Sequence, residues 1–293
     1  MRIVSLLPST TEIVCDLGLE GQLLGVTAEC KWPPRIQEGR EIVVRSFADA
    51  AMTPGEIDEF VRQRLADGLD LYQIDDAALQ RCEPDLILSQ DLCRVCAVAS
   101  GDVAAATARL NCHAEVLQID PQNLSEVFES IATIATAANV AQRGTDFVDS
   151  LRKRMTAVLD SVHGVPRRRV FVLEWIDPPF GAGHWVPDLA VAAGGEPLLA
   201  RPGERSVETT WQAITIARPE IVIVAPCGFG LEEACAQAQL VLDLVPEAAE
   251  VWAIDADAVM VRPGPRLVDG VEALAWLFHG VGDPPTDVAT RIR

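Results

Sequence analysis

The sequence predicts an α/β protein with two Rossmann-like lobes, each built on a parallel sheet, and one long rigid helix that joins them. Short runs rich in valine, isoleucine and leucine recur without strict alternation, which is typical of parallel strands covered on both faces. Helical patterns separate these runs and give the βαβ order of an α/β fold. The longest helical pattern lies in the middle of the chain, and strands resume directly after it.

The predicted strands fall into two groups along the chain. They are expected at residues 3–7, 23–27, 42–45, 85–89 and 114–119, and again at 169–174, 220–225 and 250–254. The first strand leads into a helix whose expected N-cap is Ser9, because Glu12 follows three residues later as in a capping box, and Gly18 is its expected C-cap. The free N–H groups at this helix start either bind an anion or a polar ligand edge, or are simply capped.

Two helices are predicted in the middle of the chain, at residues 123–138 and 140–162. In the second helix, apolar residues recur every three or four positions, at Phe147, Leu151, Met155, Val158 and Val162. This helix would be about 35 Å long, and it would be stiffer than a flexible linker. We therefore predict an N-terminal lobe at residues 1–122, a helical connector at 123–165 and a C-terminal lobe at 166–293.

The composition is that of an acidic folded protein. The 293 residues include 24 Lys and Arg against 43 Asp and Glu, which gives a net charge of −19. This charge disfavours nucleic acid and anionic membrane surfaces as partners, because both recruit basic side chains. No apolar run reaches the ~18–20 residues that a membrane span needs.

The first residues give a prediction about location. The apolar run at residues 3–7 is shorter than the ~7–15 residues of a secretory h-region. With Met1 as the true start, we therefore expect a cytoplasmic protein. If the true start lies upstream, the protein would be periplasmic.

Common catalytic motifs are missing from the sequence. It contains no P-loop, no Rossmann glycine fingerprint and no Gly-x-Ser-x-Gly nucleophile elbow. The 4 histidines do not form a two-histidine zinc helix. The sequence therefore predicts a binding protein and not an enzyme.

Three unusual segments follow the carboxyl ends of predicted strands, at residues 29–34, 90–97 and 174–185, and a fourth at 209–211 opens a helix. In open α/β sheets, ligands bind at these strand ends. The segments carry four of the 6 tryptophans, namely Trp32, Trp175, Trp185 and Trp211. Tryptophan offers a large rigid face and one N–H donor. The set suits a bulky, partly planar small-molecule ligand, or alternatively some of the tryptophans fill the core.

The cysteines suggest a second kind of site. Cys93 and Cys96 form a Cys-x-x-Cys pair, and with Cys30 and either His184 or Glu29 they would make a soft site for zinc, iron or another thiophilic metal. The pair could also be a redox couple or purely structural. The alternative function is therefore a cytosolic metal-binding or metallo-enzyme module that uses Cys30, Cys93, Cys96 and His184.

Seven stretches of sequence carry a resemblance to a known family. They are residues 2–12 (RIVSLLPSTTE), 24–27 (LGVT) with 32–34 (WPP), 82–87 (CEPDLI), 169–175 (RVFVLEW), 176–183 (IDPPFGAG), 193–196 (AGGE) and 218–222 (RPEIV). In this order they resemble the class III periplasmic binding proteins of the iron-siderophore and cobalamin type, and most closely the cobalamin-binding branch. The resemblance covers nearly the whole chain.

The resemblance implies a function in ligand capture for an ABC transporter. A corrinoid such as cobalamin would be clamped in a cleft between the lobes. Together with the tryptophan segments, the resemblance gives the ligand-binding set Pro8, Ser9, Trp32, Trp175, Phe180, Gly183, His184, Trp185 and Trp211.

The resemblance also implies a permease as partner. Binding proteins of importers dock through one acidic residue on each lobe. The matching positions here are Ala77, with Asp75 and Asp76 beside it, and Gln212. The docking pattern is therefore incomplete, since the second lobe has no carboxylate at the matching position.

Overall fold

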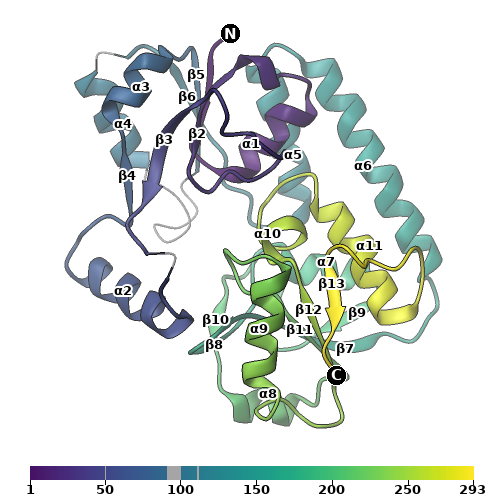
Figure 1. Ribbon diagram of the computed structural model, residues 1–293. Coiled ribbons are helices and arrows are strands. Elements are labelled where there is room, and N and C mark those ends of the chain that lie inside the picture. The colour runs from purple at the N-terminus through teal and green to yellow at the C-terminus, as the bar shows by residue number, and fades with distance from the viewer. Residues whose placement is uncertain (50, 91–99, 111) are drawn as a thin grey trace. The chain divides into compact units, whose positions relative to one another are not determined.

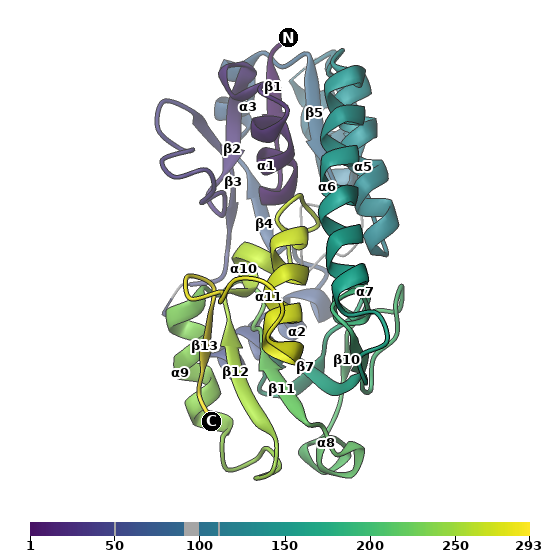
Figure 2. The same cartoon turned by 90° about the vertical axis from the view of Figure 1, so that its right-hand side faces the viewer.

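The computed structural model describes residues 1–49, 51–90, 100–110 and 112–293, which divide into two compact α/β units (Figures 1 and 2). Unit 1 comprises Met1–Pro121 and Glu126–Val148, and unit 2 comprises Gln122–Ser125 and Asp149–Arg293. Each unit has its own sheet of mostly parallel strands, which confirms the predicted α/β fold class. The domain boundaries given above, with a separate connector, remain a prediction.

The sheet of unit 1 has the strand order β4-β3-β2-β1-β5-β6. The strands are β1 (Ile3–Ser5), β2 (Leu23–Thr27), β3 (Glu41–Ser46), β4 (Tyr72–Ile74), β5 (Leu86–Ser89) and β6 (Glu115–Gln118). All neighbours are parallel except β3 and β4. Ile3 of β1 lies opposite Leu23 on one side and Leu86 on the other, so β1 is central and fully buried.

The helices of unit 1 lie between these strands in the chain. They are α1 (Pro8–Asp16), α2 (Pro54–Ala66), α3 (Asp76–Cys82) and α4 (Ser100–Arg109), with a 3-10 turn η1 (Glu20–Gln22). Apolar residues of α3 and α4 pack with Val4, Val43 and Ile87 of the sheet in one buried cluster. Cys82 belongs to this cluster, and burial raises the pKa of its thiol to about 11, so it is a core residue.

The start of α1 differs from the prediction. The N-cap is Leu7 and Pro8 is the first helical residue, so Ser9 lies inside the first turn and the predicted capping box is wrong. The physical reason is that Pro8 has the backbone angle of a first helical residue and lacks an N–H that would need a partner. The hydroxyls of Thr10 and Thr11 instead donate to the Leu7 carbonyl, each at 3.2 Å.

Two helices occupy the middle of the chain, α5 (Leu124–Ala137) and α6 (Ala141–Ser161). Their bounds agree with the predicted ranges to within two residues. Near the start of α6, a Cβ added at Gly144 would collide with the Ala135 methyl, so the two helices touch closely there. Leu151 and Met155, two of the residues expected on the apolar stripe of α6, are buried.

The sheet of unit 2 has the order β10-β8-β7-β11-β12-β13, and β9 also pairs with β7. The strands are β7 (Arg168–Ile176), β8 (Pro179–Gly181), β9 (Gly195–Pro197), β10 (Val207–Glu208), β11 (Ile221–Val224), β12 (Glu250–Ile254) and β13 (Ala289–Arg291). The strands β9, β7, β11 and β12 are parallel, whereas β8, β10 and β13 join antiparallel. The parallel core places the ends of β7, β11 and β12 at one edge.

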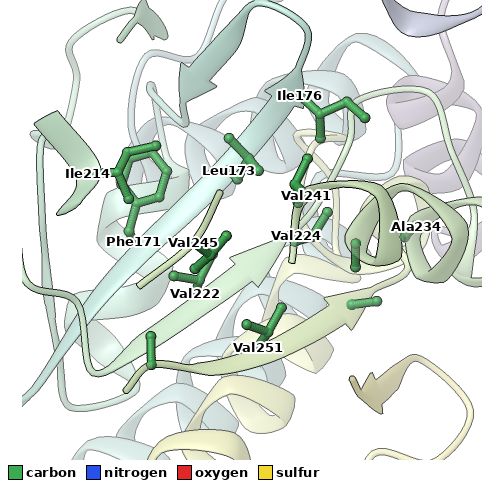
Figure 3. Packing of buried hydrophobic residues seen from close by; sticks show 13 residues of the cluster. Phe171, Leu173, Ile176, Ile214, Val222, Val224, Ala234, Val241, Val245 and Val251 are labelled. Carbon is green, nitrogen blue, oxygen red and sulfur yellow. The ribbon is translucent and has the colours of Figure 1, made fainter. Parts of the chain in front are cut away.

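The core of unit 2 lies between this sheet and its helices, which are α7 (Val186–Ala192), α8 (Trp211–Ala217), α9 (Leu231–Val241), α10 (Ala256–Val259) and α11 (Leu267–His279). Figure 3 shows Phe171 and Leu173 of β7 on the same side of the sheet as Ile214 of α8 and Ala234 of α9. No helix in the described part of the chain is long and apolar enough to cross a bilayer.

Candidate functional site

An aromatic pair lies at the carboxyl edge of the unit 2 sheet. Leu173 of β7 is opposite Val224 of β11, so the segments that follow these two strands start side by side. Trp175 lies near the end of β7 and Phe229 lies in the segment after β11, and their ring centroids are 5.9 Å apart at an interplanar angle of 46°. Both side chains are partly exposed, and the Trp175 indole N–H donates to the Asp177 carbonyl at 3.0 Å. The pair therefore offers aromatic surface at a strand end where α/β proteins bind ligands.

Sequence reasoning found Trp175 but missed Phe229. Phe229 follows β11 in a short turn in which its N–H donates to the Pro226 carbonyl and Gly228 has a φ of +88°. The available signal resembled the one that selected Trp175, namely an aromatic residue within a few positions of the predicted end of a buried parallel strand.

The turn between β8 and α7 is built around Gly183 and His184. A Cβ at Gly183 would collide with the backbone of Arg205 and Ser206, so only glycine permits this close approach. The backbone N–H of His184 donates to the Glu204 carbonyl at 2.6 Å, and its carbonyl accepts from the Gly203 N–H at 3.0 Å. This turn therefore binds the segment between β9 and β10 through main-chain contacts.

Glu174 is the acidic residue most perturbed by its surroundings at this edge. Its carboxylate accepts from the Ser206 hydroxyl at 2.9 and 3.0 Å and from the Gly183 N–H at 3.4 Å. Burial raises the pKa of Glu174 to about 7, although the hydrogen bonds from its two donors, Ser206 and Gly183, act to lower it. A carboxyl with a pKa near neutrality in such a position is a functional-site candidate. Sequence reasoning did not single out Glu174, because Ser206 is far from it in the chain.

Other residues of the predicted ligand-binding set in unit 2 have different surroundings. Trp185 is only 4% exposed, and its indole N–H donates to the Met260 carbonyl at 2.9 Å, so in this structure it is part of the core. Trp211 begins α8 and packs partly against the core cluster. Phe180 is half-buried in β8, opposite Glu208. Trp175 and Phe229 therefore lie together at the candidate site, whereas Trp185 belongs to the core.

Charged side chains of both signs lie near the ends of β7 and β12, and Arg266 and Arg262 both act on the carboxyl of Asp255. Asp177 follows β7 and is exposed, and Asp255 caps α10 by accepting from the Ala258 N–H at 2.8 Å. Arg262 lies 2.6 Å from Asp257, and both side chains of this ion pair are only 12% exposed. The basic charge of Arg262 is therefore already offset.

In unit 1, the predicted site residues Pro8 and Ser9 lie at the start of α1, just after the central strand. Pro8 is partly buried and Ser9 is buried. Beneath them, the Ser5 hydroxyl lies 2.6 Å from the Thr10 hydroxyl and donates to the Leu7 carbonyl at 2.8 Å. These bonds fix the helix start to the end of β1. Trp32 follows β2 and is 40% exposed, so its indole face is accessible on this unit.

Cys30 belongs to this hydroxyl network. It is only 1% exposed, and its sulfur lies 3.2 Å from the Thr11 hydroxyl and 3.3 Å from the Thr27 hydroxyl. Cys93 and Cys96 lie outside the described residues. Within the described ranges, no group of three or more His, Cys, Asp or Glu side chains could hold a metal ion. The metal site with Cys30 and His184 therefore stays a prediction without support from the described geometry.

Two α/β units with aromatic residues at strand carboxyl ends have the arrangement in which α/β proteins bind small molecules. The chain belongs to the periplasmic binding protein family, whose model matches residues 3–263. This confirms the resemblance noted in the sequence. Members of this family are substrate-binding proteins and not enzymes, which also confirms the expectation of a non-catalytic protein.

Individual relatives agree with the family assignment. The uncharacterized ABC transporter substrate-binding lipoprotein YvrC of Bacillus subtilis (strain 168) is 22% identical over 283 residues, which cover 94% of this chain and 78% of the relative. A periplasmic heme binding protein from Pseudomonas aeruginosa is 17% identical with a TM-score of 0.73, covering 99% of this chain and 97% of that one. The periplasmic vitamin B12 binding protein BtuF of Vibrio cholerae is 20% identical with a TM-score of 0.64, covering 94% of each chain. These likenesses show a shared fold.

The predicted cytoplasmic location is wrong. The matched relatives are periplasmic or lipoprotein substrate-binding proteins, as is typical of the family. The prediction rested on the apolar run at residues 3–7, and that run is in fact the start of the protein core, because Ile3 and Val4 are fully buried in β1. A buried strand says nothing about the compartment in which the protein works.

Proposed function

We propose that this protein is the substrate-binding component of an ABC importer for an iron-, heme- or B12-type ligand, and that the ligand is cobalamin or a related corrinoid. The observation that carries the proposal is the pair formed by Trp175 and Phe229 at the carboxyl ends of two neighbouring parallel strands. Aromatic faces at this position suit a large, partly planar ligand. Trp32 supplies a further accessible indole on unit 1.

Charge favours a corrinoid over the other ligand types. Heme carries two propionates and ferric siderophores are commonly anionic, and such groups are best held by Arg or Lys. The edge of unit 2 carries Glu174 and Asp177, and Arg262 is paired with Asp257, which leaves the exposed Arg205 beside Ser206 as a basic residue of the neighbouring segment. The rim of a corrinoid consists largely of neutral amides, which carboxylates and backbone carbonyls can accept from without a charge conflict.

The proposed importer partner is an ABC permease that docks on residues near the ends of both units. On unit 1, Asp75 caps α3 by accepting from the Ala78 N–H at 2.9 Å, and Asp76 pairs with Arg109 at 3.0 Å. On unit 2, Gln212 is exposed on α8. Because this position has no carboxylate, we expect Gln212→Glu to strengthen co-purification with the permease at low ionic strength, and unchanged recovery would contradict docking at α8.

Titration calorimetry with cyanocobalamin, hemin and a ferric siderophore tests the ligand. We expect saturable binding of cyanocobalamin, and a loss of about tenfold or more in affinity for Trp175→Ala and Phe229→Ala, since each removes one aromatic face. Trp276→Ala is the matched control, because Trp276 pairs edge-on with Trp252, away from the candidate site. Thermal unfolding verifies that each variant is folded.

The possible outcomes distinguish the proposed importer function from the proposed corrinoid ligand. Binding of hemin or the siderophore with no response to cyanocobalamin would refute the corrinoid and keep the importer function. No binding of any of the three would refute both. Stoichiometric zinc or iron in protein purified without added metal, together with no ligand binding, would instead favour the alternative metal-binding module.

A further inference from the structure

The segment between β9 and β10, residues 199–206, is held against the β8–α7 turn by a compact set of contacts. We call it the latch segment. It begins at Leu199, whose φ of +58° lies in the left-handed region. Its Gly203 N–H and Glu204 carbonyl bond to the two backbone groups of His184, and its Ser206 hydroxyl bonds to Glu174. Most of its side chains are exposed, so few apolar contacts hold it in place.

We propose that Glu174 and Ser206 form a proton-linked latch, which holds this segment on the turn when Glu174 is neutral and releases it more readily when Glu174 is charged. The geometry supports a latch because one carboxyl joins three parts of the chain. It sits on β7, contacts the β8–α7 turn through the Gly183 N–H, and contacts the latch segment through the Ser206 hydroxyl.

The direction of the effect follows from desolvation. The docked segment contacts the Glu174 carboxyl through Ser206, and shielding a carboxyl from water disfavours its charged form. The pKa of Glu174 is raised to about 7 with the segment docked, against an ordinary value of 4.5. When the segment lifts and water reaches the carboxyl, the pKa falls back toward the ordinary value. A state with the higher pKa binds protons more tightly, so protonation favours docking and deprotonation favours opening.

No charged side chain of the described residues accounts for this behaviour. The influences on the pKa of Glu174 are burial, the Ser206 hydroxyl and the Gly183 N–H. Ionisable residues do occur on the surrounding elements, and they are Asp177 after β7, His184 on the turn, Glu204 and Arg205 in the latch segment and Cys227 after β11. Of these groups, Glu174 is the one whose carboxyl is bonded directly to the latch segment in the described contacts.

The size of the effect can be worked out from the two pKa values. If opening restores the ordinary value in full, the docking equilibrium is about tenfold more favourable at pH 6 than at pH 8. If opening exposes the carboxyl only in part, the ratio of the docking equilibria at pH 6 and pH 8 is smaller. If opening does not expose it, docking does not depend on pH.

Hydrogen–deuterium exchange of the protein without ligand measures this opening, because the His184 and Gly203 amides are bonded across the contact. After correction for the intrinsic rate, we expect about tenfold greater protection of both amides at pH 6 than at pH 8. Glu174→Gln keeps the shape but does not titrate, so its protection should be the same at both pH values. The amides of β5, which lies in unit 1, serve as an internal reference.

Two further variants make the test independent of the behaviour of Glu174→Gln. Ser206→Ala removes a hydrogen bond that lowers the pKa of Glu174, so the midpoint of the protection change should move to higher pH. Gly183→Ala should abolish protection at every pH because its Cβ collides with the latch segment, whereas Gly21→Ala, with open space around the site, should change nothing. Equal protection of the wild type at pH 6 and pH 8, or a tenfold change that persists in Glu174→Gln, would overturn the proposal.

Discussion

Replacing Glu174 by glutamine should change how stability depends on pH. Glutamine has nearly the same shape and retains an oxygen that can accept from the Ser206 hydroxyl, but it carries no charge at any pH. Burial raises the pKa of Glu174 from 4.5 to about 7 in the folded protein. Between these two values the folded state binds more protons than the unfolded state, so the stability contributed by this group falls as pH rises.

The magnitude follows from the same shift. One pKa unit corresponds to about 1.4 kcal/mol. This shift therefore sets an upper limit of about 3 kcal/mol on what the titration of Glu174 contributes to the free energy of unfolding. The stability of the wild type relative to Glu174→Gln should therefore fall by up to about 3 kcal/mol between pH 4.5 and pH 8. If the latch segment opens, water reaches the charged carboxylate. The free energy that opening costs is then the upper limit on this fall in stability wherever that cost is below about 3 kcal/mol.

Urea unfolding followed by tryptophan fluorescence and circular dichroism at pH 5 and pH 8 measures this difference. All other titrating groups are shared by the two proteins, so their contributions cancel in the comparison. Glu247→Gln, at an exposed position after α9, is the matched control and should leave the pH dependence unchanged. The reasoning is refuted if the wild type and Glu174→Gln lose stability in parallel from pH 5 to pH 8.

Three further predictions concern the framework of unit 2, and urea unfolding checks each of them. Trp185→Phe loses the bond from the indole N–H to the Met260 carbonyl, so we expect a cost of about 1 kcal/mol; no change would show that the bond contributes nothing net. Arg262→Met leaves the nearly buried Asp257 without its cation, and we expect a cost of about 3 kcal/mol, with part of it regained in the double variant with Asp257→Leu. Phe171→Ala should cost about 3–5 kcal/mol, because Phe171 is 1% exposed at the centre of the core cluster, and a cost under ~1 kcal/mol would contradict that placement.

The central strands of both sheets were predictable because parallel strands in an α/β fold must be apolar along their whole length. β2 and β12 have the predicted bounds, and β7 differs from its predicted range only by extensions. The strands that were missed are short and lie on the margins. These are β4, β8, β9, β10 and β13, which have two or three residues each; all but β9 pair antiparallel, and all but β4 contain proline, glycine or a charged residue. Their pairing depends on neighbours that are distant in the chain, which no local pattern records.

The candidate site was predictable to the extent that position after a strand is a local property. Trp175 directly continues the apolar run of β7, and the rule that ligands bind at strand carboxyl ends selected it. Glu174 and Phe229 acquire their meaning only from tertiary contacts, with Ser206 in one case and with Trp175 in the other. The prediction of Ser9 as the N-cap of α1 was wrong for a related reason. A serine near a helix start matches the capping pattern even when the preceding proline already occupies the first helical position.

The latch and the proposed ligand are tested by separate measurements. Hydrogen exchange responds to the small fraction of molecules with the latch segment open, whereas affinity responds to the fraction that is competent to bind. An apparent dissociation constant is raised only by the fraction of protein that is not competent to bind. If the latch segment is open in about 0.1% of molecules at pH 6 and about 1% at pH 8, the affinity for a corrinoid is unchanged within error, whereas the exchange protection of His184 falls about tenfold. A flat pH profile for cyanocobalamin binding is therefore compatible with the latch. A pH-dependent affinity that disappears in Glu174→Gln would instead mean that the open state is well populated and that the turn carrying Gly183 and His184 contributes to the ligand site.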